Sequence, residues 1–332
     1  MARLDISHIK TLFPGMLVAS ITGLSALFLS QHYGAPAMLF ALLLGIALSF
    51  LYENNTCKAG IEFTASSILR IGVALLGLRI AFDDLMSLGL STIIILISAV
   101  LSTIIIGVTL SKALGLSKRF GALTGGSVAI CGASAAMAIS AVLPNDKNKE
   151  RDTLLTIIGI TSLSTIAMVV YPILTNALGL SAHESSIFLG GTIHDVAQVV
   201  GAGYSISEQT GDLATLVKLV RVSFLMPVVL MFVLVINAKN KNDVSPVQSS
   251  GFPLFLIAFV ILMLLNSFID LPNTLTEEAT TVSRFFLVIS IAAIGMKTNL
   301  AQLTSVGVKP IILMILETLW IALFILAAIL YL

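Results

Sequence analysis

The residues of this 332-residue chain best suited to chemistry are a histidine and the acid that follows it, His194 and Asp195. They come directly after the pair Gly190-Gly191 and Thr192-Ile193, and Gln198 stands one helical turn further on. Histidine titrates near neutral pH, so a buried His–Asp pair can bind and release a proton. The pattern therefore favours an ion-coupling site, with a histidine that only packs in a core as the alternative.

Two stretches, one around these residues and one earlier in the chain, are rich in Gly, Ala, Ser and Thr. We place them in the segments 119–142 and 185–206, where GGSV begins at Gly125 and GGTI begins at Gly190. Each glycine weakens a helix by about 1 kcal/mol relative to alanine. Irregular backbone at membrane depth survives only where protein or a watery cavity surrounds it. Both segments are thus predicted to be discontinuous helices or re-entrant hairpins, and close helix packing through small residues is the alternative.

Such broken helices suit the binding of an anion. A helix that begins inside the membrane directs free N–H groups and the positive end of its dipole into the cavity. Hydroxyl groups and a cation would add to this site, and glycines would let an oxyanion approach the backbone. The residues predicted on this ground are Gly125, Gly126, Ser127, Ser134, Gly190, Gly191, Thr192 and Arg70. The same segments could instead hold Na⁺ through unwound carbonyl groups.

Other ionisable residues lie within apolar runs, where charges are expensive and are functional candidates by default. Glu317 lies inside the last run and is predicted to carry a proton or a cation, or to pair with a neighbouring cation. Arg221 follows Lys218 by three residues and could line a cavity near the anion, but we expect it to reach the membrane surface from the start of its helix. Arg284 is expected to do the same.

Enzymatic motifs are absent from the sequence. The four histidines show no HExxH arrangement, and neither GxSxG nor a Walker A motif occurs. Cys57 and Cys131 match no metal or redox spacing. We therefore expect no enzyme activity, no metal and no cofactor.

The composition indicates the elements that must position these residues. Hydrophobic residues make up 57% of the chain and charged residues 11%, and the mean hydropathy is +1.06, whereas soluble domains carry about 25% charged residues. A net charge of +1 leaves no basic surface for nucleic acid. The chain is predicted to be an all-α polytopic membrane protein, one domain over 1–332 with about 9–11 transmembrane helices of about 20 residues each. The candidate spans are 12–30, 36–51, 60–82, 88–110, 119–142, 153–177, 185–206, 213–237, 252–269, 281–297 and 306–331.

An internal repeat and the distribution of cations indicate the topology. Residues 71–97 align without gaps to residues 289–315, and the alignment pairs Gly77 with Gly295 and Gly89 with Gly307. Weak internal symmetry is typical of secondary transporters, so an inverted repeat is expected. Lys and Arg favour cytoplasmic loops. This rule predicts a cytoplasmic N-terminus, a cytoplasmic loop at 238–250 and, if the glycine-rich segments re-enter, a cytoplasmic loop at 145–152.

Three motifs carry a resemblance to a known family: GGSVAICGASAAMA at 125–138, GTIHDVAQVVGAG at 191–203 and GLRIAFDDLMSLG at 77–89. They resemble the YeiH-like sulfate exporter family, which is grouped with the bile acid/arsenite/riboflavin transporter superfamily. The resemblance implies a carrier of the bacterial inner membrane that moves sulfate or another sulfur oxyanion or sulfonate. It also adds Cys131, Gly132 and Gln198 to the residues expected at the substrate site.

Together these observations predict a secondary active transporter of a small anion that works by alternating access. His194, Asp195 and Glu317 are the candidates for coupling to H⁺ or Na⁺. The expected partners are the anion, the coupling ion, the lipid bilayer and, for a homodimer, a second copy of the chain, but no nucleic acid. A cation/proton antiporter of related fold that uses Asp195 and Glu317 is the alternative.

The first prediction tests the re-entrant topology. The loop Asn145–Asp152 carries three cations and should face the cytoplasm, with the segment 121–140 returning to its own side. A cysteine placed at Asn148 should therefore be shielded from a membrane-impermeant thiol reagent in intact cells. Ready labelling of that cysteine would indicate eleven full crossings.

Overall fold

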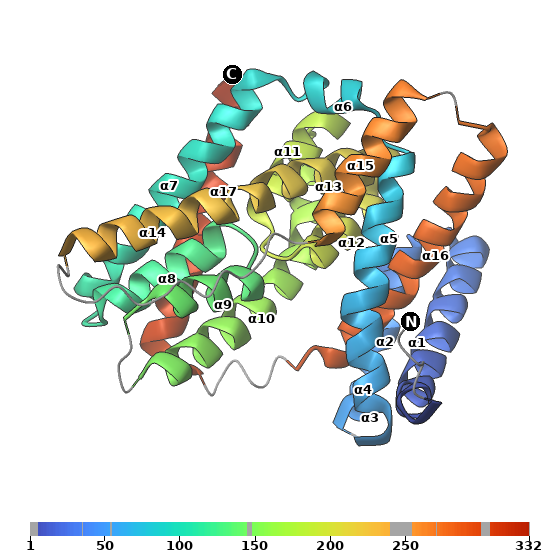
Figure 1. Cartoon of the computed structure of the whole chain (residues 1–332), viewed down its shortest axis with the longest axis horizontal. Coiled ribbons are helices and arrows are strands. Elements are labelled where there is room, and N and C mark those ends of the chain that lie inside the picture. The colour runs from blue at the N-terminus through green and yellow to red at the C-terminus, as the bar shows by residue number, and fades with distance from the viewer. Residues whose placement is uncertain are drawn as a thin grey trace. The chain divides into compact units, whose positions relative to one another are not determined.

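The fold is helical throughout the part of the chain that the structure describes. The computed structural model describes residues 6–34, 36–53, 55–144, 148–239, 254–269, 271–299 and 306–331 (Figure 1). Seven helical stretches in these ranges are long and apolar enough to cross a membrane, and shorter apolar helices accompany them. The predicted all-α membrane fold is confirmed, and each of the eleven candidate spans coincides with one or more helical elements.

The chain forms two compact units. The first comprises Met1–Ser87, Val200–Asp212 and Pro253–Asn299, and the second comprises Leu88–Val199, Leu213–Phe252 and Leu300–Leu332. Two helices, α12 (Val196–Ile206) and α13 (Glu208–Ser223), contain boundaries between the units. The predicted loop 238–250 lies outside the described residues except for its first two, as do the first three residues of the predicted loop 145–152.

The first unit is built around α16 (Asn273–Lys297), which packs against α1 (Ile6–Tyr33), α2 (Ala37–Ala47) and α5 (Leu69–Leu75). Helices α2 and α16 approach closely because glycines face each other: a Cβ on Gly45 would lie 2.9 Å from Gly295 Cα. Ser290 Oγ donates a hydrogen bond to the Thr64 carbonyl at 3.0 Å. The remaining elements of this unit are α3 (Phe50–Glu53), α4 (Asn55–Phe63), the π-helix η1 (Thr64–Ile68), the 3-10 helix η2 (Leu76–Leu78), α6 (Phe82–Ser87) and α15 (Leu254–Phe268).

The second unit carries the two glycine-rich segments. Its first segment forms α8 (Lys118–Ala129) and α9 (Ala133–Val142), and the second forms α11 (Ala182–Thr192) and the start of α12. Helix α7 (Gly89–Ala113) packs against both α8 and α17 (Val308–Tyr331). The unit is completed by α10 (Lys149–Ala177), α14 (Leu225–Lys239) and most of α13.

The two matched repeats share a local feature. Gly89 and Gly307 occupy corresponding positions in the alignment, and their φ angles are +72° and +90°. Each lies where a long helix begins, α7 in one case and α17 in the other. Only glycine adopts this conformation at little cost, so the same turn geometry accounts for the shared residue type.

The second prediction concerns the contact between α7 and α8. A Cβ on Gly121 would lie 2.6 Å from Ser111 Cβ and closer still to the Gly107 carbonyl. Gly121→Val should destabilise the protein by about 1–3 kcal/mol, because overpacking forces the backbone or its neighbours to move. Thermal unfolding in detergent would measure the effect, and Ala113→Val on the exposed side of α7 is the control. Equal midpoints for the two variants would contradict close packing at this contact.

Candidate functional site

Both glycine-rich segments are interrupted helices, but the interruptions lie beyond the glycine pairs. Helix α8 ends at Ala129 and the chain resumes as α9 after Gly132, whose φ is +64°. Helix α11 ends at Thr192, and α12 begins after Asp195. The prediction that both segments are interrupted is therefore correct, and the interruptions lie at 130–132 and 193–195.

The glycine pairs serve helix packing instead. A Cβ on Gly125 would lie 3.0 Å from the Thr103 carbonyl of α7, and one on Gly191 would lie 2.7 Å from Ile325 of α17. The residues that follow the pairs are also engaged locally. Ser127 donates its hydroxyl hydrogen to the Leu123 carbonyl. This is the small-residue packing considered as the alternative, and it positions the interruption a few residues further along each segment.

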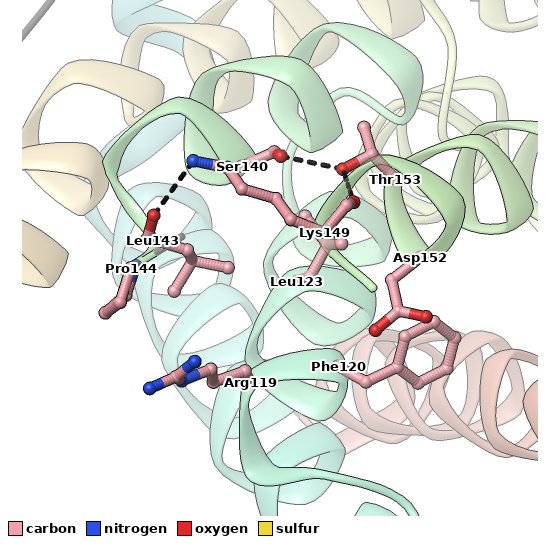
Figure 2. A pocket seen from close by; sticks show the side chains of 9 residues that line it. All are labelled: Arg119, Phe120, Leu123, Ser140, Leu143, Pro144, Lys149, Asp152 and Thr153. Carbon is pink, nitrogen blue, oxygen red and sulfur yellow. Dashed lines mark hydrogen bonds between the residues drawn. The ribbon is translucent and has the colours of Figure 1, made fainter. Parts of the chain in front are cut away.

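The first segment folds back on itself. Gly126 of α8 faces Ile139 of α9, although thirteen positions separate them in the sequence. Arg119 at the start of α8 and Leu143 and Pro144 after the end of α9 line one small pocket (Figure 2). Both ends of the segment thus lie together and the interruption forms its tip. This is the geometry of a helical hairpin, and its re-entry into the membrane stays a prediction.

Two buried cations of α13 hold the carbonyl ends of α8 and α11. Arg221 Nε donates to the Ala129 carbonyl at 2.6 Å, and Nη1 donates to the Ile193 carbonyl at 3.0 Å. Lys218 Nζ donates to the carbonyls of Ile130 and Ile193 at 2.6 and 2.9 Å. Arg221 also bonds the carbonyls of Val128 and Gly190. The positive charges thereby meet the negative ends of both helix dipoles.

The expectation that Arg221 reaches the membrane surface is wrong. Its side chain and that of Lys218 are fully buried, with 0% of their surface exposed. Neither forms an ion pair with a carboxylate within the described residues. The sequence analysis missed both as site residues, although the spacing of three residues placed them on one helix face. One signal in the sequence could have identified them. Both cations stand next to an apolar run, and this run comes after the two broken segments in the chain.

The interruptions of the two segments meet. A Cβ on Gly132 would lie 3.6 Å from His194 Cβ. The helices that begin there differ in one respect. The Asp195 carboxylate accepts a hydrogen bond from the Ala197 N–H at 3.0 Å and so caps α12, whereas Gly132 offers α9 no side-chain cap. The first turn of α9 therefore lacks the carboxylate cap that α12 has.

His194 lies at this meeting point and is fully buried. Its Nε2 is 3.0 Å from the Thr318 hydroxyl of α17, while its Nδ1 has no hydrogen-bond partner among the described residues. Gln198 accepts a hydrogen bond from Ser164 at 2.7 Å and donates one to Thr165 at 3.3 Å, which attaches α12 to α10. Asp195 is half-buried.

Some of the other predicted residues lie where the two interruptions meet, and the rest do not. Cys131 is buried at the tip of the first hairpin, and Ser134 is exposed at the start of α9. Thr192, like Ser127, donates its hydroxyl to its own helix, so neither group is available as a donor to an anion. Arg70 belongs to the first unit, where its side chain is exposed on α5, and the structure does not group it with the others. Within the described residues no cluster of three or more His, Cys, Asp or Glu could hold a metal ion.

Glu317 is fully buried in the middle of α17. Its Oε1 is within hydrogen-bond distance of the Thr124 hydroxyl of α8, at 2.8 Å, and no cation lies within ion-pair distance among the described residues. The expected pairing with a neighbouring cation is therefore not observed there.

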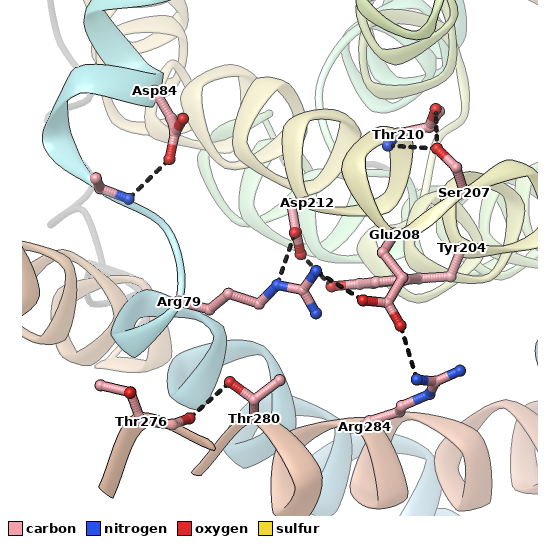
Figure 3. A network of polar contacts seen from close by, with 11 residues as sticks. Arg79, Asp84, Tyr204, Ser207, Glu208, Thr210, Asp212, Thr276, Thr280 and Arg284 are labelled. Carbon is pink, nitrogen blue, oxygen red and sulfur yellow. Dashed lines mark hydrogen bonds and ion pairs between the residues drawn. The ribbon is translucent and has the colours of Figure 1, made fainter. Parts of the chain in front are cut away.

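A polar network occupies the first unit (Figure 3). Arg79 pairs with Glu208 at 2.9 Å and with Asp212 at 2.8 Å, and Glu208 also pairs with Arg284 at 2.7 Å. The Tyr204 hydroxyl donates to Asp212. Arg284 is largely exposed, as expected of a residue at the edge of its span, but its charge is paired.

The third prediction concerns Arg221. Arg221→Met should destabilise the protein by at least about 3 kcal/mol, because each buried carbonyl left without a donor costs about 1–3 kcal/mol. The loss of stability in Arg221→Lys should lie between zero and that of Arg221→Met, since one ammonium group cannot reproduce the guanidinium fork. Arg284→Met, which breaks an exposed pair, should cost about 0–1 kcal/mol. Thermal unfolding in detergent would rank the three, and equal losses would show that Arg221 does not hold the hairpins.

Comparison with known proteins identifies relatives over nearly the whole chain. A family model described as conserved hypothetical protein 698 matches residues 14–314. The chain is 51% identical to the UPF0324 membrane protein TauZ of Paracoccus pantotrophus, over 96% of this chain and 95% of that protein. It is 50% identical to a UPF0324 membrane protein of Chlorobaculum tepidum, over 96% of this chain and 89% of that one. No solved structure matches the chain.

These relatives are bacterial membrane proteins, and they agree with the helical membrane fold and with the YeiH-like motifs. The chain therefore belongs to the UPF0324 family of membrane proteins.

Proposed function

We propose that this protein is a secondary active transporter of a small anion, and that the anion binds where the two interrupted segments meet. The observation that carries the proposal is the pair of buried cations at this point. Lys218 and Arg221 are fully buried, and neither forms an ion pair with a carboxylate among the described residues. The site thus has a surplus of positive charge.

Electrostatics favours an anion over a cation at this position. A cation in a broken helix is normally coordinated by unwound backbone carbonyls. Here those carbonyls already accept hydrogen bonds from Lys218 and Arg221. A small anion would instead find His194 Nδ1, which has no hydrogen-bond partner among the described residues, and the first turn of α9, which has no carboxylate cap. It would also offset part of the cost of burying two charges.

The resemblance to YeiH-like proteins narrows the substrate class to sulfate, another sulfur oxyanion or a sulfonate. Alternating access would move the units or hairpins around the site, and an inverted repeat would give the two access states similar energies. We place the protein in the bacterial inner membrane with its N-terminus in the cytoplasm. The His194–Asp195 pair would couple flux to a proton, and a homodimer is compatible with this arrangement. The runner-up function is a cation/proton antiporter that uses Asp195 and Glu317.

Tracer flux in proteoliposomes would test this function. Labelled sulfate, sulfite, thiosulfate and taurine should be tried with imposed proton and sodium gradients, against liposomes without protein. Accumulation of an anion that follows one gradient supports the proposal. Flux of cations alone would establish the antiporter instead. A thermal-shift screen would choose the anion, because a ligand that binds the folded state raises its stability.

The fourth prediction separates the two residues of the pair. Asp195→Asn keeps the size and the capacity to cap α12 but removes the titrating charge. It should abolish gradient-driven transport and leave exchange at equal concentrations partly intact. His194→Gln should shift the pH dependence of flux without stopping it, measured across about pH 5.5–8.5 to bracket an ordinary histidine pKa of about 6.5. Unchanged gradient-driven uptake by Asp195→Asn at every pH would exclude a coupling role for the pair.

A further inference from the structure

Glu317 is a buried acid of the second unit, and the anion site proposed above gives it no role. Its carboxyl packs against α7 at Gly107, where there is no side chain: a Cβ on Gly107 would lie 2.5 Å from Glu317 Oε1. Its second oxygen, Oε2, has no hydrogen-bond partner among the described residues. A carboxylate in this position would have one hydrogen bond and no cation, which is the costly case for a buried charge.

The hydrogen bonds of Thr124 indicate where a proton belongs. A threonine hydroxyl has one hydrogen to donate and two lone pairs to accept with. Thr124 Oγ1 lies 2.8 Å from Glu317 Oε1 and 3.1 Å from the Phe120 carbonyl of its own helix. If Glu317 carries a proton on Oε1, it donates to Thr124 and Thr124 donates to Phe120. Both hydroxyl hydrogens, that of Glu317 and that of Thr124, then have an acceptor. If Glu317 is ionised, Thr124 donates to it and the Phe120 carbonyl loses the Thr124 hydrogen.

Among the described residues, no charged side chain forms an ion pair with the Glu317 carboxyl. The charged groups on the helices packed against α17, and the other charged group of α17 itself, stand at helix ends: Lys112 on α7, Lys118 and Arg119 on α8, Lys149, Glu150, Arg151 and Asp152 on α10, His183 and Glu184 on α11, and Lys309 on α17. His194, in the interruption between α11 and α12, is the titratable group that faces the neighbouring Thr318.

We propose that Glu317 is a proton-binding site, separate from the His194–Asp195 pair, in which a neutral carboxyl joins α17 to α8. Adjacent residues of α17 connect this site to the anion site. Glu317 bonds Thr124 of the first hairpin, and Thr318 contacts His194 in the second interruption. Loss of the proton would place a charge against α8 and disturb both contacts together. The transport role of this proton rests on the function proposed above, but the presence of the proton does not.

The fifth prediction is spectroscopic and needs no substrate. Infrared spectra of the purified full-length protein in lipid nanodiscs at neutral pH should contain the C=O stretch of a protonated carboxyl group. The difference spectrum between wild type and Glu317→Gln should show the loss of that band. Glu184→Gln is the control, because hydrogen bonds from the Ser181 hydroxyl and backbone N–H lower the pKa of the exposed Glu184 carboxyl. Its difference spectrum should show the loss of a carboxylate band.

A carboxylate signature in the Glu317→Gln difference spectrum would overturn the proposal. If Glu317→Gln does not fold, Thr124→Val provides a second test. It removes the acceptor of the proton, so the protonated band should remain but change frequency. A band that does not respond to Thr124→Val would also contradict the proposed geometry.

Transport measurements then test the role of the proton. In proteoliposomes Glu317→Gln should retain exchange at equal anion concentrations and lose uptake driven by a pH gradient, with unchanged anion affinity by calorimetry. Uptake equal to wild type would overturn the coupling role. If wild type moves no anion, the function proposed above fails while the infrared result still decides whether Glu317 holds a proton.

Discussion

The second unit depends on the hydrogen bonds that Lys218 and Arg221 make to backbone carbonyls. A helix that stops inside a bilayer exposes carbonyl groups that neither lipid nor its own backbone can satisfy. Here one face of α13 supplies the missing donors for α8 and for α11 at the same place. The two interruptions can therefore meet in a buried environment. The contact between Gly132 and His194 is part of that meeting.

The positions of the broken segments could be predicted from the sequence because glycine content and low leucine content are local properties. Their exact geometry could not. The glycine pairs weaken the helix only slightly, and the close approach of α7 and α13 compensates for this, so the helices continue to Ala129 and Thr192. The break falls where the chain can adopt a positive φ, at Gly132, and where Asp195 can cap a new helix. Both features are local, but the helices reach these points only because distant elements, α7 and α13, pack against the glycine pairs.

The roles of individual polar residues were harder to predict for the same reason. Lys218 and Arg221 bond to carbonyls 25 to 93 positions earlier in the chain, and no local pattern marks a carbonyl as unsatisfied. Ser127 and Thr192 were expected to face a ligand, but the nearest acceptor of a helical hydroxyl is its own helix. Arg70 was expected inside because its neighbours are apolar, yet apolar neighbours are equally typical of a face turned to lipid. Glu317 was correctly expected to be buried, because an acid in the middle of an apolar helix is costly in lipid and turns toward the protein interior.

The manner in which α13 holds the hairpins has an evolutionary consequence. Lys218 and Arg221 recognise main-chain oxygens, which every amino acid possesses, and not the side chains of the tips. Substitutions at tip positions such as Cys131 therefore leave the attachment of the hairpins intact so long as the backbone path is kept. A lineage can diversify the lining of the site, and with it the ligand preference, without rebuilding the scaffold. Divergence in this family should then be tolerated at the tips and strongly resisted at two positions of α13.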